Sequence, residues 1–373
     1  MRALFDRIHR EGPVRFDVAV DALLYGEGGF FTSGAGAGRK ADFLTSPEVG
    51  PLFGAVVARA LDAEWRRLGA PDPFVVIEAA AGRGALARAV LDAAPSCLPA
   101  LRYVCVERSP VLRSRIDEVL PVEPAANIFG AVVRGDDPDD DASVISGTGP
   151  VFAVLDDLPY VPVTGVVLAN ELLDNIPFRL VERTTAGWSE VLVTVEADRL
   201  RELLVPAAPD VVDEAGRLAP GATPGARLPL QHGAVEWLRR ALGVLERGRV
   251  IVIDYADESP SLAARPWREW LRTYRDHGAG REPLDWPGDQ DVTCEVAIDQ
   301  LTRVRAPVAN RSQAEWLAAH GIDDLVAEAK AAWQARAHIG DIDALKHRSR
   351  AGEAITLADP SGLGAFRVLE WTV

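Results

Sequence analysis

The segment with the clearest chemical content is Val75–Gly84, where an apolar run reaches Glu78 and continues as a turn of small residues. Only small residues let a ligand approach backbone N–H groups closely at the start of a helix. A tight strand-to-helix connection needs the same residues, so the turn alone does not establish a ligand. Glu107 ends the next apolar run, about 25 residues beyond the turn, where a carboxylate can accept hydrogen bonds from both hydroxyls of a ribose. Together these features predict an adenosyl ligand, and the lack of a full G-x-G-x-x-G favours a compound other than a dinucleotide.

A second polar segment, Ala169–Pro177, follows another apolar run and contains Glu171 and Asp174. Ligands of open α/β sheets bind beyond the carboxyl ends of the strands, so these carboxylates are expected to face the reacting centre. The alternative is that they only stabilise the beginning of a helix through its dipole.

The elements that must position these residues alternate between strands and helices, which is typical of a parallel α/β sheet. Buried strands are expected at 74–78, 103–107, 151–155, 165–170, 249–254 and 366–373, and helices at 84–94 and 109–120. The carboxyl ends of parallel strands lie at one edge of the sheet, so Glu78, Glu107 and Glu171 are expected at that edge.

Other segments frame this sheet. Residues 1–70 are expected to form a helical segment that packs on the core, with helices at 1–11, 14–25 and 51–68 and a Gly-rich loop at 26–43. Residues 71–373 form the main domain, with an antiparallel insertion at about 178–230 and a second insertion at about 256–350. Within the second insertion, helical pieces are expected at 261–274, 312–319, 322–337 and 341–350.

Composition excludes several classes of function. The 373 residues carry 55 acidic and 40 basic side chains, and the net charge of −15 disfavours nucleic acid and anionic membranes as partners. Three cysteines without C-x-x-C spacing and six scattered histidines suggest neither disulfides nor a metal site. The absence of a signal peptide and of a long apolar run favours a cytoplasmic protein outside the membrane.

A set of ordered motifs resembles the MidA-like methyltransferases, a family that includes the mitochondrial complex I assembly methyltransferase. The motifs run over nearly the whole chain: Asp42–Gly54 preceded by Tyr25 and Gly29–Phe31, Asn170–Pro177, Asp254-Tyr255, Leu271–Tyr274 with His277, Gly288–Thr293 and Gly362–Leu369. The chain departs from the family pattern at Ala80, where the cofactor turn of the family has its first glycine, and at Ala41, which replaces the glycine before Asp42-Phe43. Ala80 is expected either to narrow the methionine pocket or to shift the backbone.

The resemblance implies a Rossmann-like class I methyltransferase sheet, with an N-terminal helical segment and inserted substrate-side elements, that uses S-adenosyl-L-methionine (SAM). The residues assigned to the cofactor are Glu78, Ala80, Gly82, Gly84, Glu107, Ser46, Pro47 and Asn170. Those assigned to catalysis are Glu171, Asp174, Asn170 and His277, and those on the substrate side are Asp42, Glu48, Tyr274 and Asp291.

The resemblance also implies that the methyl acceptor is an arginine nitrogen of a protein. A guanidinium would need carboxylates to orient it and to accept a proton, and Glu171 and Asp174 are the first choice for both tasks. Two alternatives remain open: an O- or N-methyltransferase of a peptide or small molecule, and a SAM-binding assembly factor without turnover. A protein or peptide acceptor is the expected partner, and a homodimer is one of the oligomeric states left open.

Overall fold

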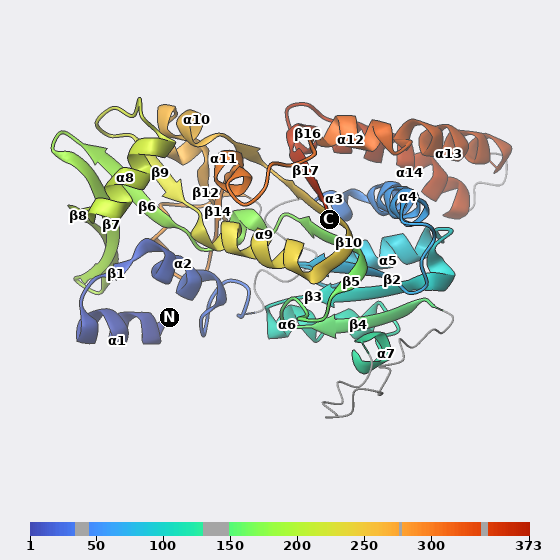
Figure 1. The fold of residues 1–373 in the computed structure, drawn as a ribbon, viewed down its shortest axis with the longest axis horizontal. Helices are drawn as coiled ribbons and strands as arrows, with labels where there is room; N and C mark the ends of the chain where they lie inside the picture. The colour runs from blue at the N-terminus through green and yellow to red at the C-terminus, as the bar shows by residue number, and fades with distance from the viewer. Residues whose placement is uncertain (34–44, 130–148, 276–277, 337–341) are drawn as a thin grey trace. The chain divides into compact units, whose positions relative to one another are not determined.

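The computed structural model describes residues 1–33, 45–129, 149–275, 278–336 and 342–373 (Figure 1). They form two compact units, which we describe separately. The parallel-sheet unit comprises the described parts of 44–170, 240–253 and 307–373. The antiparallel-sheet unit comprises those of 1–43, 171–239 and 254–306. Asp42 and His277 lie outside the described residues.

The parallel-sheet unit contains a seven-stranded sheet in the order β16-β17-β10-β5-β2-β3-β4. Its strands are β2 (Phe74–Ala79), β3 (Leu101–Val106), β4 (Val151–Leu155), β5 (Val163–Asn170), β10 (Leu245–Asp254), β16 (Ala309–Ser312) and β17 (Arg367–Thr372). The pairs from β4 through β3, β2 and β5 to β10 are parallel, while β16 runs antiparallel to β17. The strand order reverses between β2 and β5, and ligands of open α/β sheets bind at such a switch point.

The burial of the central strands explains why their sequences are almost entirely apolar. All six residues of β2 and of β3 are buried, as expected for strands covered on both faces. Gly165 in β5 and Gly248 in β10 permit an unusually close approach of neighbouring strands. A Cβ on Gly165 would overlap the carbonyl of Val75, and a Cβ on Gly248 would overlap the carbonyl of Gly165.

Helices cover this sheet. They are α3 (Ser46–Val49), α4 (Pro51–Arg67), α5 (Ala85–Asp92), α6 (Pro110–Arg113), α7 (Ala126–Phe129), α12 (Gln313–Ala319), α13 (Ile322–Arg336) and α14 (Ile342–Leu357). Helix α4 packs closely on α5, where a Cβ on Gly54 would overlap the Cβ of Ala89. Buried Glu353 of α14 accepts the backbone N–H of Leu52 at 2.9 Å, which satisfies a donor at the beginning of α4.

The antiparallel-sheet unit contains β1 (Val14–Arg15), β6 (Arg179–Thr184), β7 (Gly187–Glu196), β8 (Arg199–Pro206) and β9 (Arg227–Leu230) in one sheet. All of its pairs are antiparallel, as the alternating pattern predicts. A three-stranded sheet joins β12 (Leu271–Arg275) to β13 (Gly278–Ala279) and β14 (Asp291–Cys294), and β11 (Ala256–Asp257) pairs with β15 (Val296–Ala297). The helices of this unit are α1 (Arg2–Glu11), α2 (Phe16–Tyr25), α8 (Pro209–Leu218), α10 (Ser259–Ala264) and α11 (Ile298–Thr302), and α9 (His232–Val244) continues past the boundary at residue 239.

Two predicted helices are wrong in part. The helix expected at 109–120 ends at Arg113 and is followed by a 3₁₀ turn, η2 (Ile116–Glu118), in which Ile116 lies near Gly84. The segment expected to be helical at 261–274 ends its helix at Ala264, and 271–275 forms β12 because it pairs with both β13 and β14. Tertiary packing overrides local helical spacing at both places. No helix in the described part of the chain has the length and hydropathy needed to cross a membrane.

Candidate active site

Glu107 follows β3 at its carboxyl end and organises the turn after β2. One carboxylate oxygen, Oε2, accepts the backbone N–H of Gly82 at 2.9 Å, and Oε1 accepts that of Ser109 at 2.7 Å. Burial raises the pKa of Glu107, while these two N–H groups act to lower it. Each carboxylate oxygen has a second lone pair, so Glu107 can still accept two hydroxyl donors from a ligand.

The turn Ala80–Gly84 has the left-handed backbone conformations that close ligand approach requires. Ala80, Gly82 and Gly84 have φ angles of 60°, 57° and 78°. A Cβ on Gly82 would have no other atom within 4 Å, whereas a Cβ on Gly84 would lie 3.2 Å from Leu120 and 3.3 Å from Ile116. Gly82 therefore leaves open space beside the backbone, and Gly84 serves close packing at the beginning of α5.

Ala80 is strained, because a left-handed conformation costs an L-residue with a Cβ about 1 kcal/mol. Ala80→Gly is therefore expected to raise the free energy of unfolding by about 0.5–1 kcal/mol, despite the greater freedom of glycine in the unfolded chain. Urea unfolding measures this. Ala93→Gly is the matched control, since Ala93 is exposed and right-handed at φ −73° and its replacement should destabilise. An Ala80→Gly protein less stable than the parent would contradict the assignment of strain.

Glu78 is buried under the same turn. Its Oε2 accepts the hydroxyl of Tyr103 at 2.7 Å, and the carboxyl group also accepts the backbone N–H of Ala87 in α5. Burial is the main cause that raises the pKa of Glu78 to about 8, and the nearby charge of Glu107 adds to it. Glu78 is therefore protonated at neutral pH and supports the turn as a neutral group.

This shift predicts a pH-dependent stability. The folded pKa is raised above 4.5, so the contribution of Glu78 is complete below pH 4.5 and is lost as the pH rises through 8. Urea unfolding between pH 5 and 9 should show the parent losing several kcal/mol relative to Glu78→Gln, which does not titrate and resembles the neutral carboxyl group in shape. Parallel stability curves for the two proteins would mean that Glu78 is ionised in the folded state.

In the antiparallel-sheet unit, a second group of acidic residues lies around the turn η3 (Leu173–Asn175). Asp174, only 4% exposed, accepts the hydroxyl of Tyr255 on Oδ2 at 2.5 Å. Asp254 accepts the backbone N–H groups of Leu173 and Asp174 on Oδ2 at 3.0 and 3.3 Å, and that of Tyr255 on Oδ1 at 3.0 Å. Asp254, the last residue of β10, thus holds η3 against the end of that strand.

The two aspartates affect each other's protonation. Burial raises the pKa of Asp174 to about 6, although the hydrogen bond from Tyr255 and the nearby backbone N–H groups of Asn175 and Asp174 lower it. Burial raises the pKa of Asp254 well above its usual value, and the charges of Asp174 and Glu171 add to this effect. Each of the two carboxyl groups is therefore harder to ionise than a free carboxyl group.

Further predicted residues lie around this pair. Asn175 donates to Asp291 Oδ1 at 2.9 Å, and Asp291 pairs in register with Tyr274 between β14 and β12. Glu171 has a φ of 52°, a strained conformation for a residue with a side chain. We refer to Glu171, Asp174, Asp254, Tyr255, Tyr274 and Asp291 as the acidic cluster.

The remaining predicted residues belong to the parallel-sheet unit. Asn170 ends β5, in register with Ile253 of β10. Ser46 is fully buried and donates to Gln313 at 3.1 Å, and Pro47 follows it in the first turn of α3. Exposed Glu48 closes a capping box by accepting the backbone N–H of Thr45 at 3.3 Å. In this structure the side chains of Ser46 and Glu48 hold α3 in place.

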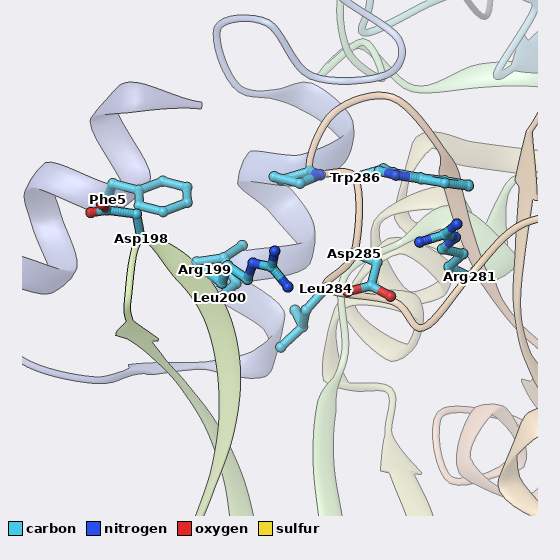
Figure 2. Close-up of a pocket in the computed structure, with 9 residues that line it drawn as sticks. Phe5, Asp198, Arg199, Leu200, Arg281, Leu284, Asp285 and Trp286 are labelled. Atoms are coloured by element: carbon cyan, nitrogen blue, oxygen red, sulfur yellow. The ribbon is translucent and has the colours of Figure 1, made fainter.

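One cavity of about 270 Å³ lies elsewhere in the antiparallel-sheet unit (Figure 2). It is lined by Phe5, Asp198, Arg199, Leu200, Arg281, Leu284, Asp285, Trp286 and Pro287, which include none of the described residues predicted for the site. The guanidinium of Arg281 lies 4.3 Å from the centre of the Trp286 ring, so the two side chains pack on each other. The cavity is smaller than typical ligand pockets, and we assign no ligand to it.

A protein-family model described as "Putative S-adenosyl-L-methionine-dependent methyltransferase" matches residues 56–314. The chain belongs to this family. The mitochondrial protein arginine methyltransferase NDUFAF7 homolog of Drosophila melanogaster is 27% identical over 296 residues, which cover 74% of this chain and 62% of the fly protein. NDUFAF7 of Rattus norvegicus is 26% identical over 325 residues, which cover 82% of this chain and 69% of the rat protein. The chain therefore spans less than two thirds of the length of the fly protein.

Solved structures agree with the family assignment. The crystal structure of a protein from Burkholderia thailandensis bound to S-adenosylhomocysteine matches 100% of this chain and 91% of its own, with 27% identity and a TM-score of 0.81. A second crystal structure from that organism matches the same shares with a TM-score of 0.78. The prediction of a Rossmann-like class I methyltransferase fold is confirmed, and SAM is the cofactor.

The residues at the ends of β2 and β3 fit that cofactor. Glu107 has free acceptor capacity for two ribose hydroxyls, and Gly82 leaves space where a side chain would otherwise stand. Both residues lie beyond the carboxyl ends of adjacent strands, β3 and β2, beside the switch point of the sheet.

Sequence reasoning missed the contribution of Asp254 and Tyr255 to the acidic cluster. The two residues formed part of the family resemblance, but they received no role in the site. A signal was present, because a carboxylate and a phenol directly follow the apolar run 249–253 at the end of a predicted strand.

Proposed function

We propose that this chain transfers a methyl group from SAM to a side-chain nitrogen of an arginine in a protein acceptor. The observation that carries the proposal is the buried carboxylate of Asp174 within the acidic cluster. Its Oδ1 atom is buried and has no hydrogen-bond partner among the described residues. A buried unpaired carboxylate oxygen is costly, and a cationic N–H donor would satisfy it. The names of the relatives, which are protein arginine methyltransferases, support the same acceptor.

The charge of the acidic cluster suits a guanidinium. Burial raises the pKa values of Asp174 and Asp254, which favours a proton on the pair. An approaching cation would reverse this preference and lower both pKa values, so that binding of the acceptor leaves Asp174 ionised and free to take a proton. An anionic acceptor would instead meet repulsion from Glu171 and Asp291.

SAM supplies an activated methyl group on a sulfonium. The acceptor nitrogen forms the new N–C bond as the S–C bond breaks, and the electron pair of that bond stays on sulfur. The nitrogen then carries one proton too many, which we assign to Asp174 Oδ1. Glu171 adds negative charge that orients the guanidinium. We also propose that six further residues contact the cofactor or the acceptor: Asp42, Glu48, Asn170, Tyr274, His277 and Asp291.

Binding without turnover is the second candidate, and the strained Ala80 in the cofactor turn favours it. O- or N-methylation of a peptide or small molecule has less support, because the acidic cluster disfavours a carboxylate acceptor and the relatives are named as protein arginine methyltransferases. Incubation of the purified chain with labelled SAM and extract, followed by mass spectrometry, distinguishes the three candidates. Methylarginine in a protein, absent from cells that lack the gene, is expected. A methyl ester, a methyl ether or a methylated small molecule would favour the alternative acceptors, and SAM binding without any product would favour the non-catalytic protein.

The cellular setting is part of this proposal. The three cysteines are buried and form no disulfide, which fits a reducing compartment. We propose the cytoplasm, although the names of the relatives place those proteins in mitochondria. We also propose that residues 1–70 and the insertions at about 178–230 and 256–350 shape the acceptor side. A homodimer stays one of the oligomeric states left open, and nucleic acid and membranes are not proposed partners.

A further inference from the structure

Several contacts within the antiparallel-sheet unit hold Tyr255 in place. Its backbone N–H donates to Asp254, and its hydroxyl donates to Asp174 Oδ2 at 2.5 Å. The guanidinium of Arg272 lies 5.3 Å from the centre of its ring, in the range of a cation–π contact. The direction of the hydroxyl toward Asp174 is therefore set by the surrounding fold.

Backbone hydrogen bonds fix the position of Asp174. Asp254 accepts the N–H groups of Leu173 and Asp174, so the turn η3 cannot rotate freely. The two carboxylate oxygens then differ: Oδ2 takes the tyrosine hydroxyl, and Oδ1 is buried without a partner among the described residues. The distance of 2.5 Å is typical of a hydroxyl that donates to an ionised carboxylate.

We infer that Tyr255 is a positioning residue, which holds Asp174 so that Oδ1 alone is presented to the nitrogen of the methyl acceptor. This inference rests on the proposed function. The torsion of a carboxylate about its last bond is broad, and a hydrogen bond to one oxygen restricts it. The same hydrogen bond stabilises the ionised carboxylate, which keeps Asp174 able to accept a proton near neutral pH.

Several other charged or titratable groups act on the same site, and any change in pH dependence must be interpreted with them in mind. They are Glu171, Arg272, Asp254, Tyr274, Asp291 and Cys294. Tyr255→Phe removes none of their charges. Its effect on Asp174 therefore isolates the hydroxyl group.

The test compares Tyr255→Phe with Tyr160→Phe, a matched control whose side chain is 90% exposed. Tyr255→Phe should lower kcat for an arginine acceptor about 10- to 100-fold, leave the KM for SAM unchanged and shift the acidic limb of the kcat profile to higher pH. Tyr160→Phe should behave like the parent. A lower Tm with an unshifted limb would show a purely structural role and overturn the inference.

A second measurement needs no catalysis. In protein with ¹³C-labelled aspartate carboxyl groups, the Asp174 signal is identified by its loss in Asp174→Asn. Its titration midpoint should rise in Tyr255→Phe, and N-acetyl-L-arginine methylamide should lower it in the parent protein. An Asp174 midpoint that neither the substitution nor the probe moves overturns the inference, even if the enzyme methylates arginine. A midpoint that both move supports the inference, even if no methylarginine forms and the proposed function fails.

Discussion

Asp174→Asn is expected to reduce methyl transfer to a protein arginine by about 10²–10⁴-fold in kcat, which is the usual contribution of a positioned general base. Asparagine keeps the shape of the side chain and can still accept the Tyr255 hydroxyl, but it neither takes a proton nor attracts a guanidinium. SAM binding should change less than about twofold, because Glu107 and the cofactor turn belong to the other unit. Single-turnover transfer from labelled SAM and calorimetry measure the two quantities.

The matched control is Asp213→Asn on the exposed face of α8, which should leave both quantities unchanged. Glu171→Gln should also spare SAM binding, but with a smaller loss of kcat if Glu171 only orients the acceptor. Full activity of Asp174→Asn would remove Asp174 from the chemistry. Equal losses of kcat in both variants would leave open which carboxylate takes the proton.

Local patterns predict most of the parallel-sheet unit. The apolar runs 74–78 and 103–107 are long enough and sufficiently β-branched to specify buried strands, and the small residues at 79–84 specify the turn between β2 and α5. The position of Glu107 follows from these elements alone, because an acidic residue after the second strand must lie at the same edge as the turn after the first. Its hydrogen bond to Gly82 is a direct consequence of that topology.

The contacts of Asp174 could not be predicted in the same way. Its partner Tyr255 lies 81 residues further along the chain, and nothing in either local segment specifies the other. The contact depends on β5 and β10 being neighbours in the sheet, which is a property of the whole topology. The same limit explains why 271–275 was expected to be helical, since only its pairing with β13 and β14 makes it a strand.

Glu107→Ala is expected to weaken SAM binding by about 10²–10⁴-fold. Two hydroxyl groups of the ribose would lose a charged acceptor, at about 1.5–3 kcal/mol for each hydrogen bond. The backbone N–H groups of Gly82 and Ser109 would also lose their acceptor, so the turn itself becomes less ordered before SAM binds. Isothermal titration calorimetry with SAM and with S-adenosylhomocysteine measures the loss. Both ligands should weaken to a similar extent, because both carry the same ribose.

Two further variants separate ligand contact from damage to the turn. Glu107→Gln keeps one acceptor oxygen and should weaken SAM less than Glu107→Ala, with a smaller effect on the free energy of unfolding. Glu118→Ala, on the exposed end of η2, is the matched control and should bind SAM like the parent. If Glu107→Ala bound SAM with unchanged affinity while the protein lost stability, Glu107 would act only on the backbone of Gly82 and Ser109. The ribose would then have to be recognised by another residue, and the placement of the cofactor at the end of β3 would be wrong.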